Sequence, residues 1–136
     1  MTDDNCIFCK IIAGEIPCNK VYEDDVLMAF LDIHPNNSGH TLIVPKEHFE
    51  NLLETPAHVA EALMVAVQLL APRAMAAVGA TGFNLGVNTG SSSGQVVMHT
   101  HAHIIPRFEG DGLVHWPTKE ISAEMLEEIA EKMRVL

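Results

Sequence analysis

Residues 96–106 read VVMHTHAHIIP, with histidine at three alternate positions, His99, His101 and His103. Alternate side chains of an extended strand lie on the same face, so the three imidazoles would share one surface. A helix is the competing interpretation, with His99 and His103 about one turn apart and His101 turned away. The flanking residues are mostly β-branched and the segment ends in proline, and both features disfavour a helix. We therefore predict a strand over residues 96–106.

A group of imidazoles suits metal binding, proton transfer or covalent catalysis, because each ring titrates near neutral pH. Ordinary core or surface histidines are the alternative interpretation. The preceding segment, NTGSSSGQ at residues 88–95, is either a plain hairpin turn or a loop whose backbone N–H groups cradle an anion. A phosphate cradle beside a histidine nucleophile predicts phosphoryl or nucleotidyl transfer.

Residues 94–107, GQVVMHTHAHIIPR, resemble the signature of the histidine-triad (HIT) family of nucleotide hydrolases and transferases. Three earlier segments resemble the family as well: CIFCKII at 6–12, EIP at 15–17 and GHTLIVPK at 39–46. The resemblance spans nearly the whole chain and is strongest to the Hint-like and bacterial HIT branches. It implies a small nucleotide of the AMP or GMP type as substrate.

Length and charge limit the class of protein. The chain has 136 residues, enough for one domain with its own core, and we expect a single HIT domain over residues 1–136. A net charge of −10 without a basic stripe argues against a nucleic-acid partner. No uninterrupted apolar run approaches a membrane span, and the acidic start MTDD lacks the basic region of a signal peptide. We expect a cytoplasmic protein without a membrane partner.

Local patterns predict an α+β, HIT-like fold: an antiparallel sheet of about five strands with one long helix and a C-terminal helix. The long helix should begin after a Thr55 cap and run from Pro56 to Val78, with a kink or an end at Pro72. A helical tail, capped by Ser122, should start at about residue 120. The other expected elements are a helix at 6–13 and strands at 20–23, 26–31, 40–44 and 82–88.

The resemblance implies a mechanism. His101 would attack the α-phosphorus and form a nucleotidyl-histidine, which water hydrolyses, and no metal is required for this chemistry. His103 would support the phosphate oxygens, and His40 matches a fourth histidine near the triad. Dinucleoside polyphosphates, nucleoside phosphoramidates and adenylates are all candidate substrates.

The same resemblance assigns the binding residues. Asp32 would hold the ribose hydroxyls, although an aspartate at this point could equally be a turn former. One alternative for Phe30 is ordinary core, and Val96 stands where many Hint-like proteins carry a serine. The base would lie between Phe8, Ile16 and Phe30, and the phosphate would lie against Asn88, Gly94, Gln95 and Val96.

Cys6 and Cys9 form a C-x-x-C pair, which is half a zinc site or a redox motif. In some bacterial HIT proteins, histidines at the positions of His48 and His99 complete a Cys2His2 site. The resemblance therefore implies a structural zinc held by these four residues. Two reduced, buried cysteines beside a satisfied His48 are the alternative.

Two rival functions stay open at this stage. The three triad histidines could be the ligands of a metal-dependent hydrolase, although residues i and i+4 of a strand lie about 13 Å apart. The same pocket could also belong to a non-catalytic nucleotide sensor or scaffold. We further expect a homodimer, formed through the long apolar helix. A segment similar to HWP at 115–117 reaches the partner subunit's site in some Hint-like proteins.

Overall fold

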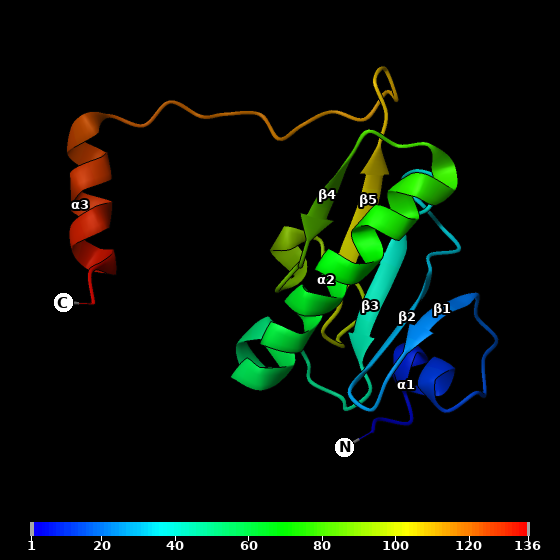
Figure 1. The fold of residues 1–136 in the computed structure, drawn as a ribbon. Helices are drawn as coiled ribbons and strands as arrows, with labels where there is room; N and C mark the ends of the chain where they lie inside the picture. Colours follow the sequence, from blue (N-terminus) through cyan, green and yellow to red (C-terminus); the bar gives the residue numbers. More distant parts are fainter. Residues whose placement is uncertain (1, 136) are drawn as a thin grey trace.

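Five strands form one antiparallel sheet, with the order β1-β2-β3-β5-β4 (Figure 1). The computed structural model describes residues 2–135, so that the two ends of the expected domain, Met1 and Leu136, lie outside the described residues. The predicted α+β class is confirmed. The strands are β1 Lys20–Glu23, β2 Leu27–Leu31, β3 Thr41–Pro45, β4 Gly82–Gly86 and β5 Ala102–Arg107.

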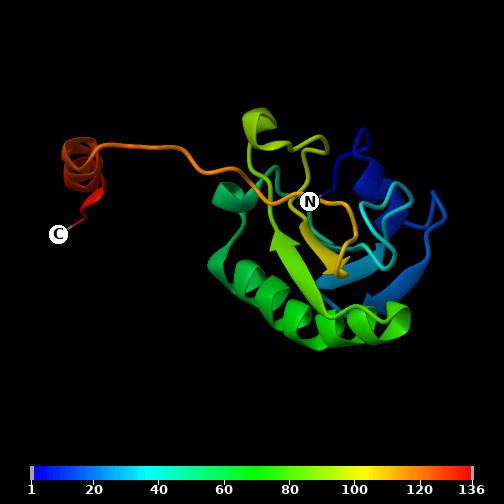
Figure 2. The same cartoon turned by 90° about the horizontal axis from the view of Figure 1, so that it is seen from above.

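The two faces of the sheet are covered by different helices (Figure 2). The long helix α2 packs on one face against Leu27 and Ala29 of β2, and the short helix α1 packs on the other face against Met28 and Phe30. Because its side chains alternate between two covered faces, β2 is apolar at every position. The helices are α1 Ile7–Ile12, α2 Ala57–Val78 and α3 Ala123–Met133, with short 3-10 helices at Leu52–Glu54 and Ser91–Ser93.

The expectations for the ends of α2 were partly wrong. Pro72 neither ends nor breaks the helix, which continues to Val78 and stops at Gly79 in the left-handed conformation. Pro72 and Gln68, whose carbonyl loses its helical partner, both lie on the exposed side, where water can bind the free oxygen. Thr55 does not cap the helix, because its hydroxyl donates to the Asn51 carbonyl instead.

The histidine strand is shorter than predicted. β5 begins only at Ala102, and residues 96–101 have no strand partner. The ladder between β3 and β5 ends because β3 stops at Pro45, which has no N–H to donate. The Pro45 carbonyl is bonded instead to the ring of His99, at 2.8 Å. The three histidines therefore do not lie on one strand face.

The C-terminal end of the chain leaves the sheet. Residues 113–122 have no regular secondary structure, and they lead to α3, which stands apart from the rest of the chain in both views (Figures 1 and 2). The predicted cap is confirmed, since the Ser122 hydroxyl accepts a bond from the Met125 amide. No residue of α3 is buried.

Among residues 2–135, α2 is the one helix long and apolar enough to cross a membrane, by length and composition alone. A helix that buries one face against a sheet meets the same description. The buried face of α2 carries Val59, Leu63, Ala66, Val67, Leu70 and Ala71.

We predict that Leu63→Ala lowers the free energy of unfolding by about 2–5 kcal/mol, because it leaves a cavity between α2 and the sheet. Leu63 is 3% exposed. The matched control is Val65→Ala on the opposite side of the helix, which is 64% exposed and should change stability by less than about 0.5 kcal/mol. Urea unfolding followed by circular dichroism measures both. Equal effects of the two substitutions would contradict the packing described above.

Candidate functional site

His101 and His103 meet at the start of β5, with ring centroids 4.8 Å apart. His103 lies in the sheet between Leu42 of β3 and Gly86 of β4, and His101 directly precedes the strand. The His101 ring is buried, and Phe8 of α1 packs edge-on against it. Helix α1 and the central strands together fix the orientation of this ring.

The backbone fixes the proton on His101. Its Nδ1 lies 2.6 Å from the His99 carbonyl oxygen, which can only accept a hydrogen bond, so Nδ1 carries the proton. In the neutral ring Nε2 then has a free lone pair. His101 is thereby prepared to act as a nucleophile through Nε2.

A second backbone group fixes the proton on His103. The amide of Asn36 donates to Nδ1 of His40 at 3.0 Å, so the neutral His40 ring has its proton on Nε2. That nitrogen lies 2.9 Å from Nδ1 of His103. Since Nδ1 of His103 accepts this bond, the neutral ring carries its own proton on Nε2. His103 is thus a hydrogen-bond donor toward any ligand at this nitrogen.

All three rings are neutral at pH 7. Burial, together with the nearby His101 and His40 rings, lowers the pKa of His103 to about 4. Burial also lowers the pKa of His40 and of His101. The neutral form is the one in which the proton positions above hold, so the site is set for nucleophilic rather than acid chemistry.

Asp32 lies at the open end of this histidine group. One carboxylate oxygen is 3.7 Å from Nε2 of His40, and the other accepts a bond from the His34 amide at 2.8 Å. Asp32 therefore forms the turn that the alternative interpretation describes. It is also placed beside the histidines, where the ribose interpretation needs it.

The three apolar residues predicted to hold the base have different surroundings. Phe8 and Phe30 are both buried and contact each other edge-on, with centroids 5.7 Å apart. Phe30 is therefore a core residue, and its contact with the base stays a prediction. Ile16 lies in the segment after α1 and is half-buried.

The Gly/Ser-rich loop has a defined shape. Gly90 and Gly94 bracket a 3-10 turn, with φ of +85° and +101°, a conformation that glycine adopts without strain. A Cβ on Gly94 would meet the Asn88 amide nitrogen at 3.4 Å, so Asn88 lies directly against this end of the loop.

The buried side chain of Gln95 holds the Gly/Ser-rich loop in place through hydrogen bonds. It is 3% exposed, accepts a bond from the Gly90 amide and donates to the carbonyls of Glu50 and Val97. These bonds hold the loop in shape, and a substrate contact by Gln95 stays a prediction. Val96, by contrast, exposes 87% of its surface, and its amide has no hydrogen bond within residues 2–135.

His99 faces a different group of side chains. Its Nε2 is bonded to the Pro45 carbonyl, so that Nδ1 points at the sulfurs of Cys6 and Cys9, 3.4 and 3.6 Å away. Nδ1 of His48 completes the group, 3.1 Å from Nδ1 of His99 and 3.4 Å from the Cys9 sulfur. The four predicted metal ligands thus converge on one point.

The spacing fits a zinc ion. Bonds of about 2.3 Å to sulfur and 2.0–2.1 Å to nitrogen give a tetrahedron with N–N edges of about 3.3 Å and N–S edges of about 3.6 Å. The observed N–N separation is 3.1 Å and the N–S separations are 3.4–3.6 Å. Four ligand atoms leave no open position, which is the arrangement of a structural site.

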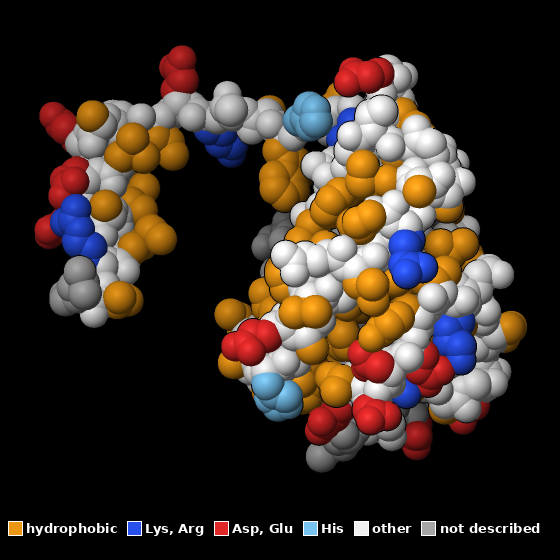
Figure 3. Space-filling model, viewed as in Figure 1, with side chains coloured by type: hydrophobic (Ala, Val, Ile, Leu, Met, Phe, Trp, Pro, Cys, Tyr) orange, Lys and Arg blue, Asp and Glu red, His pale blue; other side chains and the backbone are white. Residues whose placement is uncertain are grey.

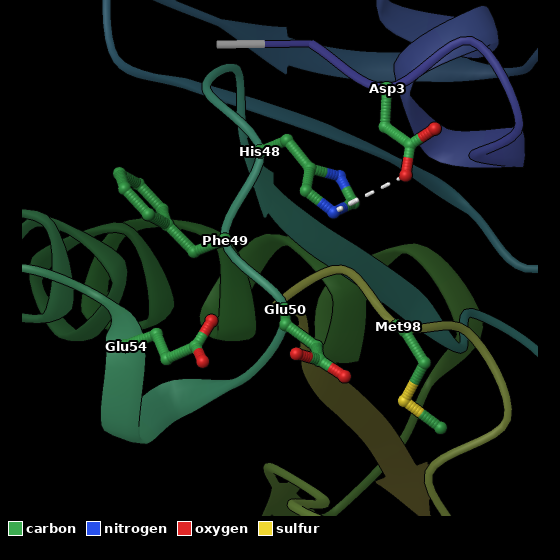
Figure 4. A pocket seen from close by; sticks show the side chains of 6 residues that line it. All are labelled: Asp3, His48, Phe49, Glu50, Glu54 and Met98. Carbon is green, nitrogen blue, oxygen red and sulfur yellow. Dashed lines mark ion pairs between the residues drawn. The ribbon is translucent and has the colours of Figure 1, made fainter.

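The second nitrogen of His99 has a fixing partner, as is usual for metal-binding imidazoles, because it is bonded to the Pro45 carbonyl. For His48, the Asp3 carboxylate lies 3.9 Å from Nε2, within ion-pair distance but beyond a hydrogen bond. Figure 4 shows Asp3 pointing at His48 across one wall of a cavity. The cavity has a volume of about 420 Å³, and His48 is the member of the group that lines it.

The triad as a whole does not form a metal site. Within residues 2–135, two groups of side chains have three or more ligand atoms close enough for one ion. One is made of Cys6, Cys9, His48 and His99 (the Cys6 group), and the other of Asp32, His40 and His103. His101 belongs to neither. This arrangement argues against a hydrolase that uses all three triad histidines as ligands.

Sequence reasoning missed several groups that set the site. The carbonyls of His99 and Pro45 and the amide of Asn36 fix three imidazole tautomers. They are backbone atoms, so no residue type marks them. Asp3 belongs to the acidic start of the chain, and only the fold brings it to His48.

A family model described as "HIT domain" matches residues 13–110. The chain belongs to the HIT family. The match covers the sheet, α2, the Gly/Ser-rich loop and all three triad histidines. The family predicted from the sequence is therefore confirmed.

Two curated relatives carry names of enzymes. The chain is 46% identical to adenylylsulfatase HINT3 of Arabidopsis thaliana, over 90% of this chain and 61% of that protein. It thus spans less than two thirds of this relative. It is 38% identical to adenosine 5′-monophosphoramidase hnt1 of Schizosaccharomyces pombe, over 95% of this chain and 96% of that protein.

Solved structures share the fold. SMU.412c from Streptococcus mutans superposes with a TM-score of 0.91 at 39% identity and covers 97% of this chain and 85% of its own. A histidine-triad protein from Mycobacterium smegmatis, described as Zn-bound, has a TM-score of 0.77 at 34% identity and covers 95% of both chains. The predicted HIT-like fold is confirmed.

Proposed function

We propose that this protein is a nucleotide hydrolase that cleaves a nucleoside phosphate derivative at the α-phosphorus through a nucleotidyl-histidine intermediate on His101. The proton on Nδ1 of His101, fixed by the His99 carbonyl, carries the proposal. It leaves Nε2 free to attack at neutral pH. The names of the two enzyme relatives support hydrolysis of adenosine phosphosulfates or phosphoramidates as the starting substrates.

In the first step Nε2 of His101 forms a bond to the α-phosphorus, and the bond from phosphorus to the leaving group breaks. The leaving group departs with the bonding electron pair. Sulfate or phosphate needs no proton to do so, whereas the nitrogen of a phosphoramidate takes up a proton from solvent as its bond to phosphorus breaks. The His101 ring becomes positively charged. Its Nδ1–H remains bonded to the His99 carbonyl, which stabilises that charge.

In the second step water attacks the phosphorus, and the P–N bond breaks with its electrons returning to Nε2. The nucleoside monophosphate leaves, and the proton of the water passes to solvent. Nε2–H of His103 donates a hydrogen bond to the phosphate oxygens in both steps and stabilises the negative charge that develops there. His40 keeps His103 in this form through the 2.9 Å bond between the rings.

The substrate would lie along the open side of the same group. The Val96 amide, which has no hydrogen-bond partner within residues 2–135, and the Asn88 side chain meet the phosphate. Asp32 binds the ribose hydroxyls, and Phe8 and Ile16 border the base. Val96 has no hydroxyl for a leaving group, so we assign that contact to backbone alone. A non-catalytic nucleotide sensor is the alternative, and a turnover assay separates the two.

We also infer a structural zinc held by Cys6, Cys9, His48 and His99. The metal would tie the N-terminal segment and α1 to the sheet. It takes no part in the chemistry, because Nδ1 of His99 faces the cysteines rather than the triad. The Zn-bound relative supports the choice of ion.

We expect His101→Ala to lower turnover of adenosine 5′-phosphosulfate and adenosine phosphoramidate by several orders of magnitude, as for a lost nucleophile. AMP binding, measured by calorimetry, should persist. Mass spectrometry of rapidly quenched native enzyme should show an added nucleotidyl group on the His101 peptide. The control is His58→Ala, an exposed histidine of α2, which should keep full activity. Near-native turnover in His101→Ala would rule out the mechanism.

Asp32→Ala should weaken binding of ribonucleotides more than of their 2′-deoxy analogues, by roughly 1.5–3 kcal/mol for lost charge-assisted bonds. Asp32→Asn is the matched control, because its side-chain oxygen can still accept the bond from the His34 amide that shapes the turn. If the carboxylate binds the diol, both variants should lose the preference for ribose. Equal losses for the two sugars would favour a role in the turn alone.

Protein purified without a histidine tag should contain about one zinc per chain, as measured by inductively coupled plasma mass spectrometry. Cys9→Ser should lose the zinc and melt at a lower temperature, with less effect on the chemical step. Cys18→Ser, a cysteine outside the group, should keep the metal. A metal-free native protein, or full retention after replacing both Cys6 and Cys9, would exclude the site.

A further inference from the structure

Thr100 lies between the first two histidines of the triad and is almost completely buried, with 1% of its surface exposed. In the proposed mechanism it contacts neither the substrate nor a reacting atom. Its peptide bond nevertheless joins the His99 carbonyl to the Thr100 amide, and that carbonyl fixes the proton on Nδ1 of His101. Because the peptide unit is planar, any group that orients this plane also sets the state of the nucleophile.

The segment between β3 and α2 orients this plane. Residues 96–101 lie outside the strands of the sheet, and the Thr100 amide donates instead to the Phe49 carbonyl at 2.8 Å. The N–H and the C=O of a trans peptide point in opposite directions. The bond to Phe49 therefore turns the His99 carbonyl to the other side, where it accepts the bond from His101.

The Thr100 hydroxyl is a second attachment to the same segment. Its oxygen lies 2.8 Å from the Thr55 hydroxyl oxygen and 3.2 Å from the Phe49 carbonyl oxygen. Thr55 gives its one proton to the Asn51 carbonyl, so the Thr100 hydroxyl is the donor in the bond to Thr55. Thr55 is buried as well, and the pair of hydroxyls is therefore shielded from competing water.

We propose that Thr100 is a positioning residue, which holds the His99 carbonyl where it keeps the proton of His101 on Nδ1. The hydroxyl bond to Thr55 is part of this hold. The inference rests on the proposed function, because it assumes that Nε2 of His101 attacks phosphorus. When the carbonyl is displaced, the proton of the neutral ring is free to occupy Nε2, and a ring in that form has no lone pair there with which to attack.

Thr100→Val removes the hydroxyl and keeps nearly the same side-chain shape. A carbon atom stays about 3.3 Å or more from an oxygen, whereas the Thr55 oxygen lies 2.8 Å from the hydroxyl that is replaced. The valine would therefore move away from the segment, and the His99 carbonyl would move with it. The 2.6 Å bond from His101 weakens steeply as its angle departs from linear.

Nitrogen-15 NMR of the imidazole rings at neutral pH reads the tautomer, because a protonated ring nitrogen and one with a free lone pair resonate in different ranges. The native His101 should show a proton on Nδ1 and a free Nε2. In Thr100→Val the two signals should shift toward each other, as the proton is shared between both nitrogens. We expect kcat to fall about tenfold, the effect of one lost buried hydrogen bond. KM for adenosine 5′-phosphosulfate should stay near native, since no substrate contact is removed.

Two further variants test the hydroxyl pair itself. Thr100→Ser keeps the hydroxyl and should restore both the native tautomer and the native kcat. Thr55→Val removes the other half of the pair and should shift the same His101 signals. Because the two hydroxyls act as one unit, the double variant should lose no more activity than Thr100→Val alone. Each variant should keep the native metal content, which shows that the effect does not pass through the neighbouring His99.

Two controls on α2 separate positioning from stability. Leu63→Ala empties the inner side of the helix, where this residue is 3% exposed, and should lower stability without moving the His101 signals. Val65→Ala removes an exposed apolar side chain from the outer side of α2, which faces the viewer in Figure 3, and should change neither. All variants are compared at a temperature where circular dichroism shows each of them folded.

A native tautomer or a native kcat in Thr100→Val would overturn the proposal, and so would a loss that Thr100→Ser does not restore. Failure of the proposed function has a different result, because turnover would then persist in His101→Ala whatever tautomer the native ring shows.

Discussion

The end of β3 at Pro45 is the constraint on which the site depends. Proline gives no N–H, so the ladder to β5 cannot continue past His101. Its carbonyl stays free of the ladder and accepts a bond from the His99 ring. This one residue releases residues 96–101 from the sheet and turns His99 away from the other two histidines.

The release divides the triad into two groups of side chains. On one side His99 joins two cysteines and His48 in a group with the dimensions of a tetrahedral metal site. On the other side His101 and His103 stay together with His40. A regular strand through all three positions would have placed them at equal spacing on one face, where neither group could close.

Backbone groups prepare the chemical site before any ligand arrives. The tautomers of His101, His40 and His99 each depend on one carbonyl or amide in a fixed segment. Burial lowers the pKa of the rings on the triad side and keeps them neutral at pH 7. Preorganisation of this kind needs no rearrangement when a nucleotide binds.

The sequence by itself determined the family and the α+β class, because spacing and residue type are local properties. It also predicted the four members of the Cys6 group through resemblance. The tertiary structure decided what local patterns cannot record: where the histidine strand starts, that Pro72 is tolerated because the affected carbonyl faces solvent, and which backbone atoms fix each imidazole. The placement of α3 was likewise decided by the tertiary structure. An amphipathic stripe predicts a covered helix, but only the fold shows that the chain carries this helix away from its own body.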